Sequence, residues 1–316
     1  MISRVADHCF WFGRYLERAE ATARMLAASA SLALDAELPA AQVWRPVVVV
    51  SGEEQEFVAD HGEAAWADGE AVQRFMVWND DNGVALARSV GGARVNARSI
   101  REVLSGEAWE AVNELHLWIA SEATATLYAQ HRELFYQQVR RSTQLTLGLL
   151  RSTMLHDEPL DFVWLGVLLE RVSQTARMLD VHHHAFTHID DKSEIIETAL
   201  WLSLLRALSG SEAFLKRSAG RISSEAVARF LLSETQFPRS IAYCVHSAHD
   251  RLCAIRPPDR HELPGGISLE RLRVLDAWVE ARRTEPLAGS GVHDLLTHVV
   301  DEVHAICGSL GTELLA

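Results

Sequence analysis

Apolar residues recur at intervals of three and four positions along most of the chain. In the N-terminal segment these positions are Ile2, Val5, Cys9, Phe12, Leu16, Ala19, Ala23, Leu26, Ala30 and Ala33. A later segment repeats the spacing at Phe162, Leu165, Leu169, Val172, Ala176 and Leu179. This period places the apolar side chains along one face of an α-helix, where they pack against partner helices. No segment alternates as a strand does, so the sequence predicts an all-α fold.

The same spacing predicts further helices. They cover residues 64–78, 84–104, 107–128, 132–155, 194–210, 224–233, 238–254, 268–283 and 292–310. The clearest loop is residues 256–266, because prolines and glycines cluster there.

The chain also contains an internal repeat. The segment that starts at Trp11 aligns without a gap with the segment that starts at Trp164, and ten of sixteen positions are identical. A fainter repeat relates residues 72–75 to residues 227–230. We predict a helical bundle made of two similar halves, residues 1–155 and 156–316, related by a pseudo-twofold and integrated into one domain.

Charge and composition narrow the function. The 316 residues include 43 acidic and 30 basic side chains, a formal net charge of −13, which argues against a nucleic-acid-binding protein. Charges interrupt the N-terminal segment, unlike a signal peptide, and no apolar run approaches the roughly 20 residues that cross a bilayer. The four cysteines are widely spaced, which favours a reducing compartment. We therefore expect a cytoplasmic protein without a membrane partner.

Each copy of the repeat carries a Glu-Arg pair, Glu17-Arg18 and Glu170-Arg171. Large apolar residues stand seven positions before and after each arginine, namely Trp11, Met25, Trp164 and Met178. We expect both arginines to be at least half buried, and a buried guanidinium needs a carboxylate or a ligand as partner. The predicted network across the helix interface consists of Glu17, Arg18, Arg24, Glu170, Arg171 and Arg177.

Two interpretations of this network are open. One is a structural cluster of ion pairs that fixes the register of the bundle. The other is a polar pocket for an anionic ligand, to which Arg14 in the same run would also contribute. The second interpretation requires the arginines to converge on a cavity rather than on one another.

A second candidate site lies in the first half only. Arg94, Arg98 and Arg101 are spaced to share one face of a helix, with Asn96 among them. Three arginines in such a row suit carboxylate or phosphate recognition, although a solvated basic face is an equally good explanation. Asp80 and Asn82 precede this helix. We expect them to cap it, and we include them among the candidate ligand-binding residues.

The remaining motifs supply no self-contained chemistry. His182, His183, His184 and His188 follow the second Glu-Arg segment, but no carboxylate ligand is specified beside them, so we predict no metal. The sequence has no Gly-rich phosphate loop and no nucleophile elbow, and we predict no cofactor.

The Glu-Arg segments resemble the bacterial alpha-E family, an uncharacterised helical family named for its Glu-Arg motif. The likeness extends over nearly the whole chain and includes residues 3–6, 13–20, 79–82, 93–98, 109–113, 230–232 and 237–240. The second copy departs from the first, with Val172-Ser173 in place of Ala19-Glu20. The resemblance implies an association with circularly permuted ATP-grasp ligases and a role in forming or modifying amide bonds of small peptides.

We therefore expect a partner or accessory subunit of an ATP-grasp ligase, which binds the ligase or a small carboxylate or peptide substrate. The chain has no ATP-binding signature, so it is not the ligase by itself. Two alternatives are open. The protein is a free-standing enzyme with Glu17 or Glu170 as general base and arginines that orient a carboxylate substrate, or it is a structural scaffold.

Overall fold

The computed structural model describes residues 2–35, 38–187, 194–218, 222–283 and 291–316. Within these ranges the regular structure is entirely helical, which confirms the predicted all-α class. The first half contains α1 (Ser3–Asp35), α2 (Ala40–Ser51), α3 (Glu54–His61), the 3-10 helix η1 (Glu63–Ala67), α4 (Gly69–Trp78), α5 (Leu86–Ser99), α6 (Gly106–Ile119), α7 (Glu122–Gln130) and α8 (Arg132–Thr153). The second contains α9 (Glu158–Thr187), α10 (Glu194–Ala207), α11 (Ser211–Arg217), α12 (Ser224–Ser233), α13 (Ile241–Ile255), α14 (Gly266–Ala281) and α15 (Gly291–Glu313).

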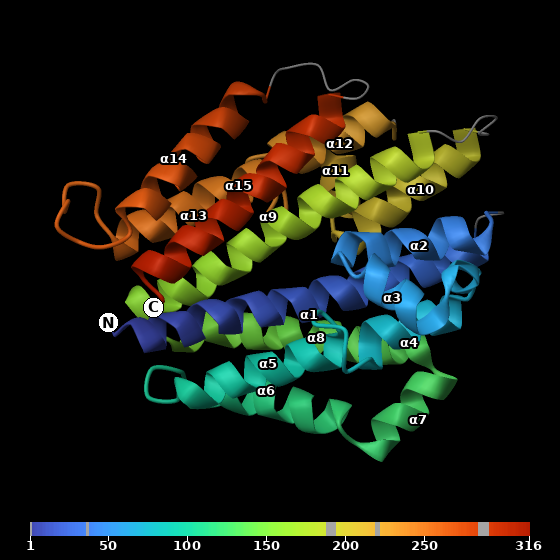
Figure 1. Ribbon diagram of the computed structural model, residues 1–316, viewed down its shortest axis with the longest axis horizontal. Coiled ribbons are helices and arrows are strands. Elements are labelled where there is room, and N and C mark those ends of the chain that lie inside the picture. The colour runs from blue at the N-terminus through green and yellow to red at the C-terminus, as the bar shows by residue number, and fades with distance from the viewer. Residues whose placement is uncertain (1, 36–37, 188–193, 219–221, 284–290) are drawn as a thin grey trace.

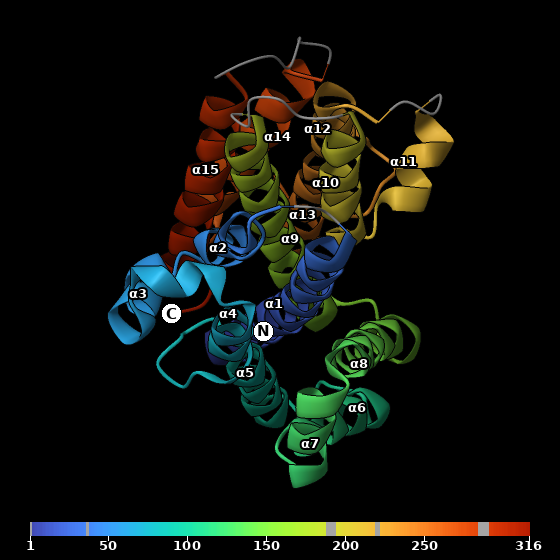
Figure 2. The ribbon, with the colours of Figure 1, turned by 90° about the vertical axis from the view of Figure 1, so that its right-hand side faces the viewer.

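The long helices α1 and α9 lie side by side through the middle of the molecule (Figures 1 and 2). Helices α5 and α8 pack against α1, and helices α13 and α15 pack against α9. Two elements cross between the halves, because α2 packs against α9 and α10 packs against α1. The same buried cluster contains Leu26 of α1 and Leu169 of α9, so the apolar core continues from one half into the other.

Two of the predicted helices divide where a side chain caps the backbone, and a third ends earlier than predicted. The helix expected over residues 64–78 divides at Asp68, whose carboxylate accepts hydrogen bonds from the Glu70 and Ala71 amides at 2.9 and 3.1 Å. The helix expected over residues 107–128 divides at Ser121, the N-cap of α7. The helix expected over residues 84–104 ends at Ser99. Each cap satisfies amides that a continuous helix would bond internally, so it favours a new start.

Gly92 allows α5 to approach α1 closely. A Cβ atom placed on Gly92 would lie 3.0 Å from the ring of Tyr15, whereas the neighbouring Gly91 has no atom within 4 Å of that position. The close contact accounts for a glycine in the middle of a helix. Within the described ranges, none of the helices has both the length and the apolar character that a membrane span requires.

Candidate functional site

Helices α1 and α9 touch through two glycines. A Cβ atom on Gly13 would lie 2.1 Å from the carbonyl oxygen of Val163, and one on Gly166 would lie 2.1 Å from the carbonyl oxygen of Phe10. Only residues without a side chain permit this approach. The side chains one turn further along each helix can therefore reach the opposite helix.

The first ion-pair centre forms around Glu170, whose side chain is 2% exposed. Arg18 of α1 donates from Nε to Oε1 at 2.8 Å and from Nη2 to Oε2 at 3.1 Å. Arg14, one turn earlier on α1, donates from Nε to Oε2 at 2.8 Å. Gln174 adds a hydrogen bond at 3.2 Å from its own helix. We call this set the Glu170 centre.

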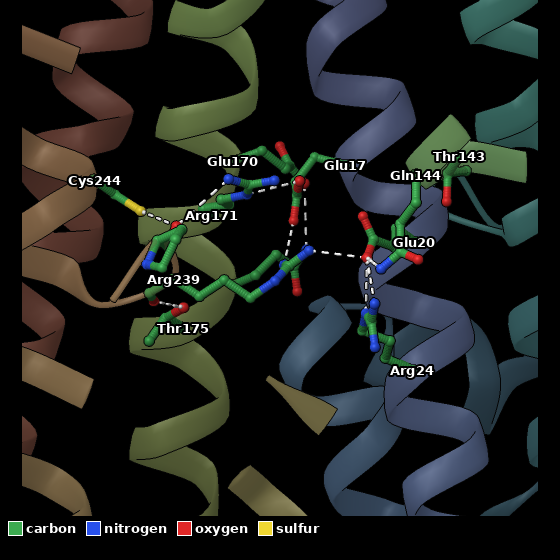
Figure 3. A network of polar contacts seen from close by, with 12 residues as sticks. Glu17, Glu20, Arg24, Thr143, Gln144, Glu170, Arg171, Thr175, Arg239 and Cys244 are labelled. Carbon is green, nitrogen blue, oxygen red and sulfur yellow. Dashed lines mark hydrogen bonds and ion pairs between the residues drawn. The ribbon is translucent and has the colours of Figure 1, made fainter. Parts of the chain in front are cut away.

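The second centre, the Glu17 centre, is shown in Figure 3. Glu17 is fully buried and accepts a hydrogen bond from Nε of Arg171 at 2.8 Å and another from Nη1 of Arg239. Arg239 also forms an ion pair with Glu20 through Nη2 at 3.0 Å, and Arg24 bonds the same Glu20 oxygen from Nε at 2.8 Å. The predicted cross-helix pairing is present, because Arg18 bonds Glu170 and Arg171 bonds Glu17.

The arginines keep the buried acids ionised. Burial acts to raise the pKa of Glu170, but the charges and hydrogen bonds of Arg14 and Arg18 outweigh it and hold the pKa well below its usual value. Burial likewise opposes ionisation of Glu20, and Arg239 and Arg24 lower its pKa. The pKa of Arg239 is raised, since Glu17 and Glu20 outweigh the effect of burial. Glu170, Glu20 and Arg239 are therefore charged at neutral pH.

A cavity of about 110 Å³ opens beside the Glu170 centre, and Glu17 does not belong to its lining. Its charged wall consists of Arg14, Arg18, Arg177 and Glu170, that is, three guanidinium groups against one carboxylate. The rest of the lining comes from α1, α2, α4, α9, α15 and the segment before α5: Thr22, Met25, Val50, Ser51, Met76, Val84, Ser173, Gln174, Val300, Val303, His304 and Cys307. A polar cavity of this size exceeds what one water molecule needs and can hold a small ligand group.

Two guanidinium N–H donors in this wall have no strong hydrogen-bond acceptor within the described part of the protein. Within the described part of the chain, Arg18 bonds protein only through Nε and Nη2, which leaves its Nη1 without a protein acceptor. Nη1 of Arg14 donates to the sulfur of Cys307 at 3.0 Å, and a thiol is a weak acceptor. Burial is the main cause that raises the pKa of the Cys307 thiol, so the sulfur is uncharged at neutral pH. The wall therefore offers donors suited to an anion.

Residues 1–314 match the model of a family named Alpha-E, described as a predicted alpha-helical domain with a conserved ER motif. The chain belongs to the Alpha-E family. This confirms the resemblance carried by the two Glu-Arg segments.

Relatives of this Alpha-E chain include an uncharacterized protein of Mycobacterium bovis (strain ATCC BAA-935 / AF2122/97) and uncharacterized proteins of Mycobacterium tuberculosis strains CDC 1551 and H37Rv. Each is 24% identical over 324 residues, which cover 96% of this chain and 35% of the relative. The chain thus spans about a third of the length of the curated relatives it matches. No solved structure matches it.

The arginine row of this Alpha-E protein lies away from the cavity. Arg94 bonds Oδ1 of Asn113 at 2.8 Å, and Arg98 is exposed on α5. Arg101 lies beyond the end of α5 at Ser99, so the three arginines do not share one helical face as predicted. Arg94 and Arg101 instead lie against the ring of Trp109, at 6.0 and 5.0 Å from its centroid.

Asn96, Asp80 and Asn82 lie outside the cavity lining. Asn96 donates to the Gly92 carbonyl at 2.8 Å. The capping prediction for Asp80 and Asn82 is wrong, because Ala85 occupies the N-cap of α5 without a side-chain cap hydrogen bond. Asn82 is buried and donates to the Phe75 carbonyl at 3.1 Å, which shapes the turn before the helix.

Sequence reasoning missed Glu20, Arg239 and Cys307 as members of these centres. Glu20 could have been found, because it stands one turn before Arg24 at the spacing of a helical ion pair. Arg239 comes from the segment before α13, 222 residues after Glu17. Residues 237–240 contribute to the family resemblance, but nothing in them indicates an ion pair with Glu17. Arg177, which the sequence placed in the ion-pair network, is exposed at the edge of the cavity.

The histidine cluster is only partly described. His188 lies outside the described residues, as does the side chain of His184. Burial lowers the pKa of His182 to about 4, and its Nδ1 lies 2.9 Å from the Met178 carbonyl oxygen. Among the residues that the structure describes, no group of three or more His, Cys, Asp or Glu side chains is arranged to hold a metal ion.

Proposed function

We propose that this protein binds a small anionic ligand in the cavity of the Glu170 centre and serves an ATP-grasp ligase as a ligand-handling partner. One observation carries the binding role: three guanidinium groups and one carboxylate face a cavity of about 110 Å³. The unused Nη1 of Arg18 is already held in place by the bonds of Arg18 to Glu170. An anion would gain charge-assisted hydrogen bonds without ordering these side chains first.

Two observations support the partner role. The family resemblance associates such domains with circularly permuted ATP-grasp ligases. The relatives also extend well beyond the matched region, since the match covers 35% of their length, so there the matched segment is joined to further polypeptide. A ligand-binding domain beside a ligase would present a carboxylate substrate or retain the amide product.

General-base catalysis by the glutamates is less well supported. A general base works best with a pKa near the operating pH. The pKa of Glu170 is held well below its usual value, and two arginines occupy its oxygens. Glu17 is fully buried and bonded to Arg171 and Arg239. In these positions the carboxylates anchor arginines rather than accept protons from a substrate.

The duplicated plan, with halves of residues 1–155 and 156–316 about a pseudo-twofold, is part of this proposal. It is supported by the matching approaches of Gly13 and Gly166 and by the exchange of arginines between Glu17 and Glu170. The exchanged packing of α2 and α10 across the halves also supports it.

Arg177→Gln tests the binding role, because Arg177 is exposed at the cavity edge and its removal should leave the fold intact. We expect isothermal titration with succinate and with inorganic phosphate to show binding of at least one anion to the unmodified protein. Arg177→Gln should weaken that binding at least tenfold with an unchanged Tm. Arg98→Gln, an exposed arginine outside the cavity, is the matched control and should bind normally. Equal affinities of the Arg177→Gln variant and the unmodified protein would reject the site.

The partner role has a separate test. Co-purification with the ATP-grasp ligase of the same genome, followed by an ATP-consumption assay with candidate amino acids, should give a stable complex. We expect its amide-forming activity to fall with Arg177→Gln. Absence of a complex together with unchanged ligase activity would reject the partner role. The binding role would still be decided by the titration experiment.

A further inference from the structure

We call the Glu17 centre closed, because protein side chains fill it, and the Glu170 centre open, because it borders the cavity. The two Glu-Arg segments differ at the positions responsible for this difference. In the ungapped alignment that pairs Glu17 with Glu170, Glu20 aligns with Ser173 and Arg24 aligns with Arg177. The acid of the first copy is thus replaced by a serine, while the arginine one turn later is kept.

In the Glu17 centre the carboxylate of Glu20 joins several groups. Its Oε1 lies 2.8 Å from Nε and 2.7 Å from Nη2 of Arg24, and 3.0 Å from Nη2 of Arg239. Gln144 of α8 donates to the same oxygen at 3.2 Å. Figure 3 shows Arg24 and Arg239 meeting at this carboxylate. Glu20 therefore supplies the negative charge that faces Arg24 and Arg239 in this centre.

A second difference lies in the segments that precede α5 and α13. Arg239 directly precedes Ser240, the N-cap of α13, and Val84 directly precedes Ala85, the N-cap of α5. Arg239 extends into the Glu17 centre, and Thr175 holds its main chain by donating to its carbonyl oxygen at 2.9 Å. Val84 is shorter and uncharged, and it lines the cavity.

Both side chains that fill the Glu17 centre therefore have small, neutral counterparts in the wall of the cavity, Ser173 and Val84. The missing guanidinium is supplied by Arg14, which aligns with Val167 and bonds Glu170. No side chain supplies the missing carboxylate within the described lining. Two carboxylates face Arg24, Arg171 and Arg239 in the Glu17 centre. The lining of the cavity has three arginines and one carboxylate, and the charge of Arg18 also acts on the pKa of Glu53, which lies outside this lining.

We propose that the ligand is a small carboxylate whose anionic group takes the place, in the Glu170 centre, that the carboxylate of Glu20 takes in the Glu17 centre. It would lie against Arg177 and within reach of Arg14 and Arg18. One bound carboxylate gives the open centre the same formal balance of three guanidinium groups and two carboxylates. The apolar part of the wall, which includes Met76, Val84 and Val303, then receives a short aliphatic portion of the ligand. This inference rests on the proposed anion-binding function.

The test introduces at position 173 the acid that the first copy has at Glu20. Ser173→Glu should reproduce the Glu20 arrangement, pair with Arg177 and occupy the carboxylate position. We expect Ser173→Glu to raise the Tm above that of Ser173→Gln, and this difference should vanish when Arg177→Gln is combined with each. Titration with acetate, butyrate and succinate should show that Ser173→Glu lowers carboxylate affinity at least tenfold.

The outcomes separate this inference from the proposed function. Carboxylate binding to Ser173→Glu that equals binding to the unmodified protein would overturn the inference. So would binding of inorganic phosphate by the unmodified protein without binding of any carboxylate, although that result would preserve an anion site. If the unmodified protein binds neither class of anion, the proposed function fails as well.

Discussion

Glu17 is the most completely enclosed acid at the interface of α1 and α9. Its carboxylate is 0% exposed and bonds Arg171 and Arg239. Removing one partner of a buried ion pair leaves the others charged and unpaired in a medium of low dielectric. We expect Glu17→Ala to lower the free energy of unfolding by about 3–5 kcal/mol in urea denaturation.

The matched control for that variant is a surface pair. Glu133 forms an exposed ion pair with Arg140 at 3.3 Å, and Glu133→Ala should cost about 1 kcal/mol or less. Similar losses for the two variants would mean that the Glu17 centre is hydrated or rearranged in solution.

His182, on α9, makes the free energy of unfolding of the protein depend on pH. Burial lowers its pKa to about 4, whereas an unfolded histidine titrates near 6.5. Below pH 6.5 the unfolded chain therefore takes up a proton that the folded chain excludes, and stability falls until about pH 4. Between pH 7 and pH 5 this loss amounts to up to about 2 kcal/mol, less for a side chain that keeps some solvent contact.

His182→Gln isolates this effect from the acids of the molecule. Urea unfolding at pH 7 and pH 5 should show a smaller decrease in stability for the variant than for the unmodified protein. Identical decreases would show that His182 titrates normally in the folded state.

At the residue scale the sequence indicated the central pairs but not their full surroundings. Large apolar neighbours identified Arg18 and Arg171 as buried, and the need for a carboxylate led to Glu170 and Glu17. Cys307 and Arg239 join from α15 and from the segment before α13, through contacts that only the complete fold creates. No spacing rule on one helix can predict such partners.

At the scale of elements, the glycine contact between α1 and α9 sets the distance across which the ion pairs form. A methyl group on Gly13 would meet the Val163 carbonyl at 2.1 Å, so Gly13→Ala must push the helices apart. We expect a loss of about 3 kcal/mol or more, the upper end for overpacking, because backbone rather than a flexible side chain must move.

Gly91→Ala is the matched control on α5. Its added methyl meets no atom within 4 Å, and alanine is the better helix former. Thermal unfolding should therefore show a gain of about 1 kcal/mol. A Gly13→Ala variant as stable as the unmodified protein would mean that the two helices do not touch at this point.

Periodicity located most helices, but not where long segments divide or which short helices exist. Asp68 and Ser121 start new helices through side-chain caps inside patterns that look continuous. Helices α2, α3 and α11 were not predicted. Helices α3 and α11 each bury one side chain and so show little periodicity, and α2 has a proline, Pro46, inside the helix.

At the scale of the whole molecule, the two halves share one interior. The buried cluster that contains Leu26 also contains Leu169, and α2 and α10 each pack on the central helix of the other half. A fragment of residues 1–155 would expose this surface and leave Arg18 without Glu170. We expect the fragment to lack a cooperative unfolding transition by circular dichroism, whereas the full chain unfolds in a single step.

Co-expression of residues 1–155 with residues 156–316 provides the control, because it should restore a soluble complex with a cooperative transition. Cooperative unfolding of the isolated first fragment would show that the halves are independent domains. The internal repeat was visible in the sequence because ten of sixteen positions around the Glu-Arg pairs are identical. The difference between the centres was hidden, since the significance of Ser173 and Val84 depends on what faces them.

The closed Glu17 centre and the open Glu170 centre also bear on how such a molecule can evolve. Positions that keep a binding site open are commonly suboptimal for stability, and stabilising them tends to impair function. The duplication proposed above offers a way around this conflict, because one copy can acquire its own counterion and become a rigid structural element. Mutations that weaken the fold around the other copy are then tolerated for longer. Under selection for stability alone we expect substitutions to accumulate at Ser173 and Val84, and selection for ligand binding should hold them small.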